Sequence, residues 1–312
     1  MRAVGFYEFG GPDKLQIIER PQPAPVIGQV LVRVTAATVN PTDAMMLRGL
    51  QAGFMTGLVP PYIAGMEFAG LVEQCADVDE VLRPGQRIMG AVDPRRPLGG
   101  AHAQLLTVSV RSVVPIGSSI DLAEAATLPM NGLTALLCLQ ALNIQPGGSV
   151  LVTGGSGCVG AYVVQLANHF GLTVYADAKD EDVRLLERLG ARHVVPRGDR
   201  MLEAIRSFKP HGVDGLVDAA LLGNQAAALV HDGGTAVSLR RSHAITDSRL
   251  NCKTIFVGNE LERTEDMKSL AELHRTGVLT ARVALRLPMD DAARAFDMVE
   301  RGGLRGRVVM QF

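Results

Sequence analysis

The glycine-rich stretch within residues 151–171 restricts the possible folds of this chain more than any other feature. An apolar run leads into glycines at positions 155, 157 and 160, and a helical pattern follows without a break. The spacing G-x-G-x-x-G between a strand and a helix is typical of the first turn of a βαβ unit, where the helix packs close to the strand. The helix is predicted to bury one apolar face, formed by Val159, Val163, Leu166, Ala167 and Phe170.

A turn without side chains exposes backbone N–H groups at the positive end of a helix dipole, where a pyrophosphate binds. We therefore expect a dinucleotide to contact the turn at Gly155, Ser156, Gly157, Cys158, Val159 and Gly160. No lysine follows Gly160, which disfavours a P-loop, and Cys158 is interpreted as a small turn residue rather than a nucleophile. The alternative is a glycine-rich turn with only a packing role.

The end of the second strand bears on which dinucleotide is bound. Asp177 lies about 20 residues past the first glycine, where an acid binds the ribose diol of NAD and repels a 2′-phosphate. Lys179 and Arg184 are within reach of the same place, and a charge-assisted bond to a phosphate contributes about 1.5–3 kcal/mol. NADPH is the predicted cofactor, and NADH stays open as an alternative.

The chain has two parts with different sequence patterns. Residues 1–118 are rich in short β-like runs broken by proline and glycine, whereas residues 119–260 alternate strands with helices. The predicted strands of the second part are 149–153, 172–176, 193–196, 213–218, 235–239 and 253–257, and helices are predicted at 181–189 and 200–208. This alternation predicts an α/β fold with a doubly wound parallel sheet. Residues 261–312 break the alternation.

Composition excludes several classes of protein. The 312 residues carry a formal net charge of −1, which argues against a nucleic-acid-binding surface. No stretch approaches about 18 consecutive apolar residues, so no membrane span is predicted, and the N-terminus lacks the apolar run of a signal peptide. The four cysteines are scattered without a C-x-x-C pair, which fits buried thiols in a reducing compartment. A cytoplasmic protein is expected.

Six segments carry a resemblance to a known family. They are GQVLVRVTAATVNPTD, PPYIAGMEFAGLVE, RPGQRIMG, ATLPMNGLTALLCL, VTGGSGCVG and RGRVVM, in that order. Together they resemble the medium-chain dehydrogenase/reductase superfamily and, within it, the zinc-independent quinone oxidoreductase family. Gln86 replaces that family's aspartate, and Arg307 replaces its terminal lysine.

The resemblance implies an architecture and an assembly. A GroES-like β domain, at residues 1–118, would be completed by the C-terminal segment 261–312, with a Rossmann dinucleotide-binding domain inserted at 119–260. Relatives pair as homodimers by joining Rossmann sheets edge to edge. The apolar run KTIFVG is the candidate edge here, so a homodimer is expected.

The resemblance also allows a test for metal. The positions that hold zinc in the zinc alcohol dehydrogenases of the same superfamily fall here on Asn40, Met66 and Met130. An amide and two thioethers are poor zinc ligands, and Glu67 alone does not make a site. The cysteine-rich lobe of a structural zinc is replaced by the short loop AVDPRRPLGGAHAQ. No bound metal is expected.

Without a Lewis acid, alcohol oxidation is disfavoured, and hydride transfer to an acceptor that is already electron-poor remains. We therefore expect a reductase of small hydrophobic quinones or α,β-unsaturated carbonyl compounds. By resemblance, Asn40 and Thr134 lie beside the nicotinamide and substrate, Leu239 and Val257 meet the nicotinamide through their backbones, and Arg307 reaches the cofactor phosphates or the cleft. For each, an ordinary structural role is the alternative.

The proton donor is the least defined part of the prediction. Many relatives carry a tyrosine where this chain has Met45, and Tyr62 and His102 are the polar candidates nearby in sequence. Methionines at 46, 55, 66 and 130 indicate either core filler or a greasy acceptor pocket. Two further alternatives stay open: an NADH-dependent reductase of the same fold, and a catalytically weak nucleotide-binding regulatory or structural protein.

Overall fold

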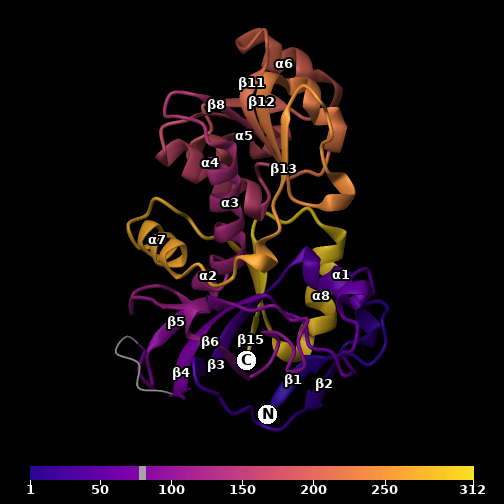
Figure 1. The fold of residues 1–312 in the computed structure, drawn as a ribbon, viewed down its shortest axis with the longest axis vertical. Helices are drawn as coiled ribbons and strands as arrows, with labels where there is room; N and C mark the ends of the chain where they lie inside the picture. Colours follow the sequence, from indigo (N-terminus) through magenta and orange to yellow (C-terminus); the bar gives the residue numbers. More distant parts are fainter. Residues whose placement is uncertain (77–81) are drawn as a thin grey trace. The chain divides into compact units, whose positions relative to one another are not determined.

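The computed structural model describes residues 1–76 and 82–312. The chain divides into two compact units, which are coloured by sequence in Figure 1. Unit 1 comprises Met1–Met130, Glu260–Arg275 and Ala281–Phe312, and unit 2 comprises Asn131–Asn259 and Thr276–Thr280. Unit 1 is therefore built from three stretches of chain, and unit 2 contains the glycine-rich turn.

Unit 2 contains a parallel sheet of six strands in the order β10-β9-β8-β11-β12-β13. The strands are β8 (Ser149–Thr153), β9 (Thr173–Ala178), β10 (His193–Pro196), β11 (Val213–Asp218), β12 (Val230–Ser238) and β13 (Asn251–Thr254). Counted from β8, the order is that of a Rossmann fold, which confirms the predicted doubly wound sheet. The order reverses between β8 and β11, and ligands of such sheets bind at the carboxyl ends of the strands there.

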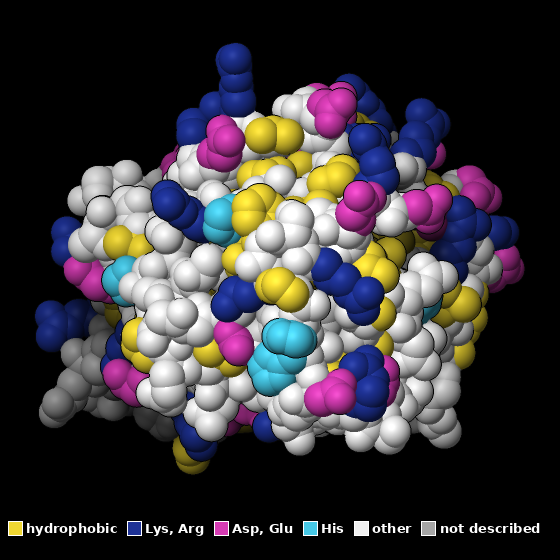
Figure 2. Space-filling model, turned by 90° about the horizontal axis from the view of Figure 1, so that it is seen from above, with side chains coloured by type: hydrophobic (Ala, Val, Ile, Leu, Met, Phe, Trp, Pro, Cys, Tyr) yellow, Lys and Arg dark blue, Asp and Glu magenta, His cyan; other side chains and the backbone are white. Residues whose placement is uncertain are grey.

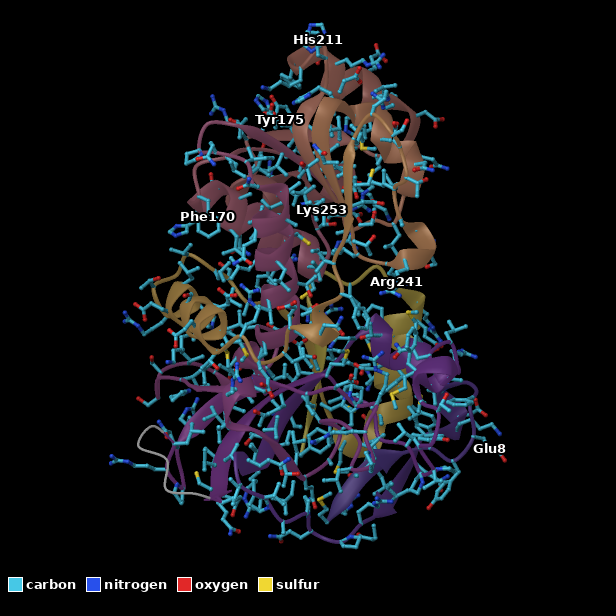
Figure 3. All side chains as sticks on the ribbon, viewed as in Figure 1. Glu8, Phe170, Tyr175, His211, Arg241 and Lys253 are labelled. Atoms are coloured by element: carbon cyan, nitrogen blue, oxygen red, sulfur yellow. The ribbon has the colours of Figure 1, made fainter. Side chains whose placement is uncertain are left out.

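The helices of unit 2 connect these strands. They are α3 (Pro129–Leu142, which begins in unit 1), α4 (Cys158–His169), α5 (Val183–Arg188) and α6 (Met201–Phe208), with short 3-10 turns η4 (Asp180–Asp182), η5 (Gly198–Arg200), η6 (Gly223–Leu229), η7 (Arg241–His243) and η8 (Val257–Asn259). Helix α4 is buried on almost every side from Gly160 to Ala167. Phe170, predicted to be buried, is 42% exposed because it caps the end of α4, beyond the packed turns (Figure 3).

The last strand of this sheet begins two residues earlier and ends three residues earlier than predicted. β13 ends at Thr254, whose register partner on β12 is Ser238, the final residue of that strand. Because no neighbouring strand continues beyond Ser238, the apolar run ends in the 3-10 turn η8. Val257 lies in that turn, so the prediction that it ends a strand is wrong.

Unit 1 contains a mostly antiparallel sheet with the strand order β14-β15-β3-β4-β5-β7, and β6 also pairs with β3. The strands are β3 (Gln29–Val39), β4 (Glu67–Cys75), β5 (Arg87–Ala91), β6 (Leu105–Ser109), β7 (Val113–Pro115), β14 (Val283–Pro288) and β15 (Arg307–Gln311), beside the pair β1 (Arg2–Gly5) and β2 (Gln16–Glu19). Together with the parallel sheet of unit 2, this confirms the predicted fold class, a GroES-like domain combined with a Rossmann sheet.

Short helices close the ends of the unit 1 sheet. They are α1 (Pro41–Leu47), α2 (Leu122–Ala125), α7 (Thr264–Arg275) and α8 (Ala292–Arg301), with 3-10 turns η1 (Pro12–Lys14), η2 (Ala52–Phe54), η3 (Val110–Ser112) and η9 (Met289–Asp291). One core cluster of unit 1 joins α1 to α8 and contains Met46, Met55, Phe296 and Met310. Met46 and Met55, two of the four methionines considered for an acceptor pocket, therefore belong to this core cluster.

Two properties bear on the classes of protein that composition disfavours, namely membrane-spanning and nucleic-acid-binding proteins. Among the described residues, no helix has the length and apolar character needed to cross a bilayer. On the face shown in Figure 2, basic and acidic side chains are interspersed, in keeping with the net charge of −1.

Candidate functional site

The glycine-rich turn joins β8 to α4. The strand ends at Thr153, Gly154 adopts a φ of 65°, and Gly157 caps the first turn of α4. A Cβ on Gly160 would lie 2.3 Å from the carbonyl oxygen of Gly154, and one on Gly157 would lie 3.1 Å from the same atom. The turn therefore requires glycine at 160 so that the helix can approach the strand. A helix N-terminus cleared of side chains fits the pyrophosphate of a dinucleotide.

Asp177 lies in β9, beside this turn, and its carboxylate is already bound. Oδ1 accepts hydrogen bonds from the backbone N–H groups of Gly154 and Gly155, and Oδ2 is 2.8 Å from the Arg197 Nε. Arg197 also donates from Nη2 to the Ser156 hydroxyl at 3.1 Å. The Asp177 side chain is only 5% exposed, whereas that of Arg197 is 36% exposed. A cation therefore covers the acid and reaches the surface beside the turn.

The Asp177–Arg197 ion pair changes what the end of β9 indicates about the cofactor. An isolated acid at Asp177 would repel a 2′-phosphate, but here its charge is balanced by Arg197 at close range. From the sequence, Lys179 and Arg184 are the cations expected near Asp177. The cation that binds it is Arg197, which directly follows β10. Lys179 is exposed and precedes η4, and Arg184 is exposed on α5. Arg197 is found only when β9 and β10 are known to be neighbours, because their carboxyl ends then lie together.

Leu239 lies at the same edge of the sheet, directly after the end of β12. The hydroxyl of Ser238, the residue before it, accepts a hydrogen bond from Ile245 N at 2.9 Å and so holds the following loop. Val257 lies farther from its strand than expected, three residues past the end of β13. The structure thus places Leu239 at a strand end and Val257 in a turn.

Unit 1 contains a second polar site, which we call the Glu67 cluster: Thr38, Asn40, Asp43, Glu67 and His102. All five side chains are buried. Glu67 Oε1 accepts from the Thr38 hydroxyl at 2.6 Å and from Asn40 Nδ2 at 3.2 Å. Its other oxygen, Oε2, accepts from the backbone N–H of Met130 at 2.8 Å, at the start of α3. One carboxylate thus joins β3, β4 and the beginning of a helix.

Local sequence explains how the cluster is held. β3 ends at Val39, Asn40 is the N-cap of α1, and Pro41 at the first helical position suits its fixed φ. Asp43 Oδ2 accepts from the Asn40 N–H at 2.8 Å, and Oδ1 accepts from the Gly65 N–H at 2.9 Å. The segment that leads into β4 is thereby tied to α1.

Burial shifts the pKa values of three residues of the Glu67 cluster. Burial raises the pKa of Glu67 and of Asp43, although hydrogen bonds and the positive charge of Arg307 oppose the shift in both cases. Burial lowers the pKa of His102, which favours a neutral ring. Because His102 Nε2 lies 2.9 Å from the Thr38 carbonyl oxygen, that nitrogen carries the proton, and Nδ1 has no hydrogen-bond partner in the described residues. Arg307, predicted to meet cofactor phosphates or the cleft, acts electrostatically on these two carboxylates.

The predicted catalytic residues occupy well-ordered positions. Asn40 is fully buried, and its amide nitrogen donates to Thr38 Oγ1 at 2.8 Å as well as to Glu67. Thr134 is 8% exposed and lies one turn along α3 from Met130. Their contacts with substrate stay a prediction.

The candidate proton donors are less accessible than their chemistry requires. His102 is fully buried, and the Tyr62 hydroxyl donates to the Leu58 carbonyl oxygen at 3.3 Å while its ring stacks on Phe9. Neither side chain presents an unengaged acidic proton at the surface of unit 1. Water as the proton source is the alternative that these contacts favour.

The donor set around Asn40 does not fit zinc. Among residues 1–76 and 82–312, no three His, Cys, Asp or Glu side chains lie close enough to hold a metal ion. Met66 and Met130 are buried thioethers, and both Glu67 oxygens accept hydrogen bonds from neutral donors. Zn²⁺ takes thiolate, imidazole and carboxylate ligands, usually four of them, and this site offers one carboxylate.

Comparison with known proteins identifies relatives over the whole chain. Residues 27–118 match the family model described as alcohol dehydrogenase GroES-like domain, and residues 189–310 match the one described as zinc-binding dehydrogenase. The chain is 26% identical to a quinone oxidoreductase of Mus musculus, over 99% of this chain and 97% of that protein. It is 28% identical to a 2-methylene-furan-3-one reductase of Solanum lycopersicum, over 99% of this chain and 79% of that protein.

A solved structure agrees with these matches. The structure of a quinone oxidoreductase from Coxiella burnetii superposes with a TM-score of 0.89 at 26% identity, covering 100% of this chain and 99% of that one. Both units and the order of their elements are therefore shared with an enzyme of this type. The chain belongs to the medium-chain dehydrogenase/reductase superfamily and is similar over its whole length to the quinone oxidoreductases within it.

Proposed function

We propose that this protein transfers a hydride from NADPH to a quinone or to an α,β-unsaturated carbonyl compound. Its membership of the superfamily makes it an oxidoreductase with a nicotinamide cofactor, and two relatives are named for quinone and enone-type reductions. The observation that carries the proposal is the donor set of Asn40, Met66 and Met130, because an amide and two thioethers do not suit the zinc ion that would activate an alcohol.

The residues that would hold the cofactor lie along one edge of the unit 2 sheet. The glycine-rich turn would hold the pyrophosphate, Arg197 the adenosine end, and the Leu239 backbone the nicotinamide. When bound, the cofactor supplies the hydride. The protein would orient the acceptor through Asn40 and Thr134 and keep water away from it, and these positioning effects make up its share of the catalysis.

The preference for NADPH rests on the Asp177–Arg197 pair. The backbone N–H groups of Gly154 and Gly155 and the guanidinium of Arg197 balance the carboxylate, so it no longer opposes a phosphate. Arg197 is the more exposed partner and carries guanidinium donors suited to a phosphate. An NADH-dependent reductase is the alternative if Asp177 turns to the ribose when cofactor binds.

One experiment separates these functions. NADPH and NADH are titrated against the purified protein, and their oxidation is then followed with a panel of quinones and enones. We expect tighter binding of NADPH and turnover with at least one acceptor class. Faster turnover with NADH would favour the alternative cofactor, and tight binding without turnover would identify a nucleotide-binding protein that has lost catalysis.

We also propose a homodimer formed through β13, acting in the cytoplasm. Parallel strands are normally covered on both faces, yet all four residues of β13, including Lys253 (Figure 3), are exposed at the edge of the sheet. The four cysteines are free thiols, which fits a reducing compartment. Light scattering at micromolar concentration tests the assembly, and a monomer would contradict it.

A further inference from the structure

The loop of residues 92–100 is anchored at both ends to the segment that leads into β4. Its first residue, Val92, donates its N–H to the Met66 carbonyl oxygen at 2.9 Å, and Gly100 donates to the Ile63 carbonyl oxygen at 2.8 Å. Ala91, just before the loop, is the register partner of Glu67. The loop therefore stands within unit 1 next to the residues on which the proposed function depends.

This loop carries two adjacent arginines and one acid. Arg95 takes the acid: its Nε and Nη2 bind the two oxygens of Asp93, both at 2.8 Å. Arg96 has no comparable partner, since its Nε donates to the Gly99 carbonyl oxygen at 2.8 Å. Its Nη2 is buried without a hydrogen-bond partner in the described residues. The second cation is thus held in place, and Asp93 acts on it through its charge without a direct hydrogen bond.

Leaving a buried charged donor unpaired is costly, and burial lowers the pKa of Arg96 to about 10. The group still carries its charge at neutral pH. Pro94 and Pro97 flank the two arginines, and proline restricts both its own φ and the residue before it. Arg96 is therefore a charged, largely buried and preorganised donor, which is the form of a ligand-binding group.

We propose that Arg96 binds an anionic group of the acceptor, so that the preferred substrates are unsaturated carbonyl compounds that carry a carboxylate. A guanidinium binds a carboxylate through two parallel hydrogen bonds, and Nη2 is the donor that such a ligand would satisfy. The inference rests on the proposed function for the reacting part of the acceptor. It adds a recognition group at a fixed place, on the loop whose ends are bonded to Ile63 and Met66.

The first test compares an acid with its ester. The probes are 4-oxopent-2-enoic acid and its methyl ester, with NADPH as reductant and kcat and KM measured for each. We expect the wild type to favour the acid, and Arg96→Gln to lower kcat/KM for the acid about 10- to 100-fold, mainly through KM. The ester should change less than about threefold. Equal losses for acid and ester would overturn the proposal.

Two variants guard against trivial explanations. Arg96→Lys keeps the charge but loses the planar fork, so it should retain part of the preference for the acid. Arg111→Gln removes an exposed cation of the same unit, paired with Glu262 at 3.5 Å, and should leave the acid-to-ester ratio unchanged. A loss of the ratio in Arg111→Gln would show that only overall charge matters.

A binding measurement separates this inference from the proposed function. The saturated acid 4-oxopentanoate is titrated by calorimetry into wild type and Arg96→Gln, and NADPH is titrated into both. Weaker 4-oxopentanoate binding in the variant, with unchanged NADPH binding, supports the anion site even if no acceptor is reduced. Weaker NADPH binding would assign Arg96 to the cofactor, and identical binding of 4-oxopentanoate would exclude the site while leaving the proposed reduction intact.

Discussion

The glycine-rich turn of unit 2 and the Glu67 cluster of unit 1 differ in how they treat polar groups: the turn leaves backbone groups uncovered, and the cluster buries polar side chains. The turn lacks side chains, which we propose lets backbone N–H groups meet a charged ligand, and Asp177 and Arg197 balance each other beside it. The cluster instead buries two carboxylates and a histidine, and hydrogen bonds with distant segments engage both carboxylates and one ring nitrogen of the histidine. Changes at the turn should therefore affect ligand binding first, and changes in the cluster should affect stability first.

The largest effect is expected from Gly160→Val. A side chain there would meet the Gly154 carbonyl oxygen at 2.3 Å, so the helix must move away from the strand. NADPH affinity should fall at least about 100-fold, equivalent to about 3 kcal/mol. Gly157→Ala is the matched control, because its Cβ lies 3.1 Å from the same oxygen and needs only a small shift. Fluorescence titration of both variants measures the difference, and similar affinities would contradict the proposed turn geometry.

Glu67→Ala tests the cluster from the other side of the comparison. It leaves the Met130 N–H, the Thr38 hydroxyl and the Asn40 amide without their shared acceptor. The free energy of unfolding should fall by about 3 kcal/mol, since each buried unsatisfied group costs about 1–3 kcal/mol. Glu73→Ala, which removes a partly exposed partner of Arg33 on the same strand, should cost less than about 1 kcal/mol. Urea unfolding distinguishes the two.

Arg197→Ala sharpens the assignment of the turn to a phosphorylated cofactor. Loss of the guanidinium leaves Asp177 as an unbalanced acid, which favours a ribose diol and repels a 2′-phosphate. The ratio of NADPH to NADH affinity should fall about 10- to 100-fold, from a loss of about 1.5–3 kcal/mol. Arg184→Ala, an exposed arginine on α5, should leave the ratio within about twofold. Parallel titrations with both cofactors provide the measurement.

A smaller effect is expected from pH in the cluster. Burial lowers the pKa of His102 below its usual 6.5, so the unfolded chain takes up a proton before the folded one. The stability that the neutral ring contributes is complete above pH 6.5 and is lost as the pH falls toward the folded pKa, with a slope of at most about 1.4 kcal/mol per pH unit. His102→Gln should lose less stability than wild type between pH 7.5 and 5.

The raised pKa values of Asp43 and Glu67 act in the opposite direction; that of Glu67 is common to both proteins, whereas that of Asp43 also depends on the charge of His102. The difference between the wild-type and His102→Gln unfolding curves therefore reports the histidine together with its interaction with Asp43. Parallel curves would mean that His102 does not titrate differently in the folded and unfolded states.

No effect at all is expected from metal removal. Because Asn40, Met66 and Met130 do not form a zinc site, dialysis against a strong chelator should change neither activity nor stability. Elemental analysis of the untreated protein gives an independent measurement. Stoichiometric zinc would contradict the proposed mechanism.

The glycine-rich turn and the Glu67 cluster also differ in how well the sequence could predict them. Strands β8, β10 and β11 coincide with their predicted bounds, because buried parallel strands are short apolar runs closed by turn residues. Asp121 likewise caps α2, because its carboxylate accepts a hydrogen bond from the Glu124 N–H at 3.0 Å. These features depend on neighbours in the sequence, as the glycine-rich turn does.

The missed features depend on strand order and register. Arg197 reaches Asp177 only because β10 pairs with β9, and the Glu67 carboxylate collects donors from positions 38, 40 and 130. The end of β13 was misplaced because its length is set by the partner strand and not by its own apolar residues. Local patterns contain none of this information.

The pairing of β15 with β3 has a consequence for the order of folding during synthesis. Residues 308–311 complete a ladder with residues 36–39, so the sheet that carries Thr38 stays open until residues 308–311 have been synthesised. Unit 2 is almost contiguous, from Asn131 to Asn259, and is free to fold while translation continues. The nascent polypeptide would thus complete the unit that carries the glycine-rich turn first, and the unit that carries the Glu67 cluster last.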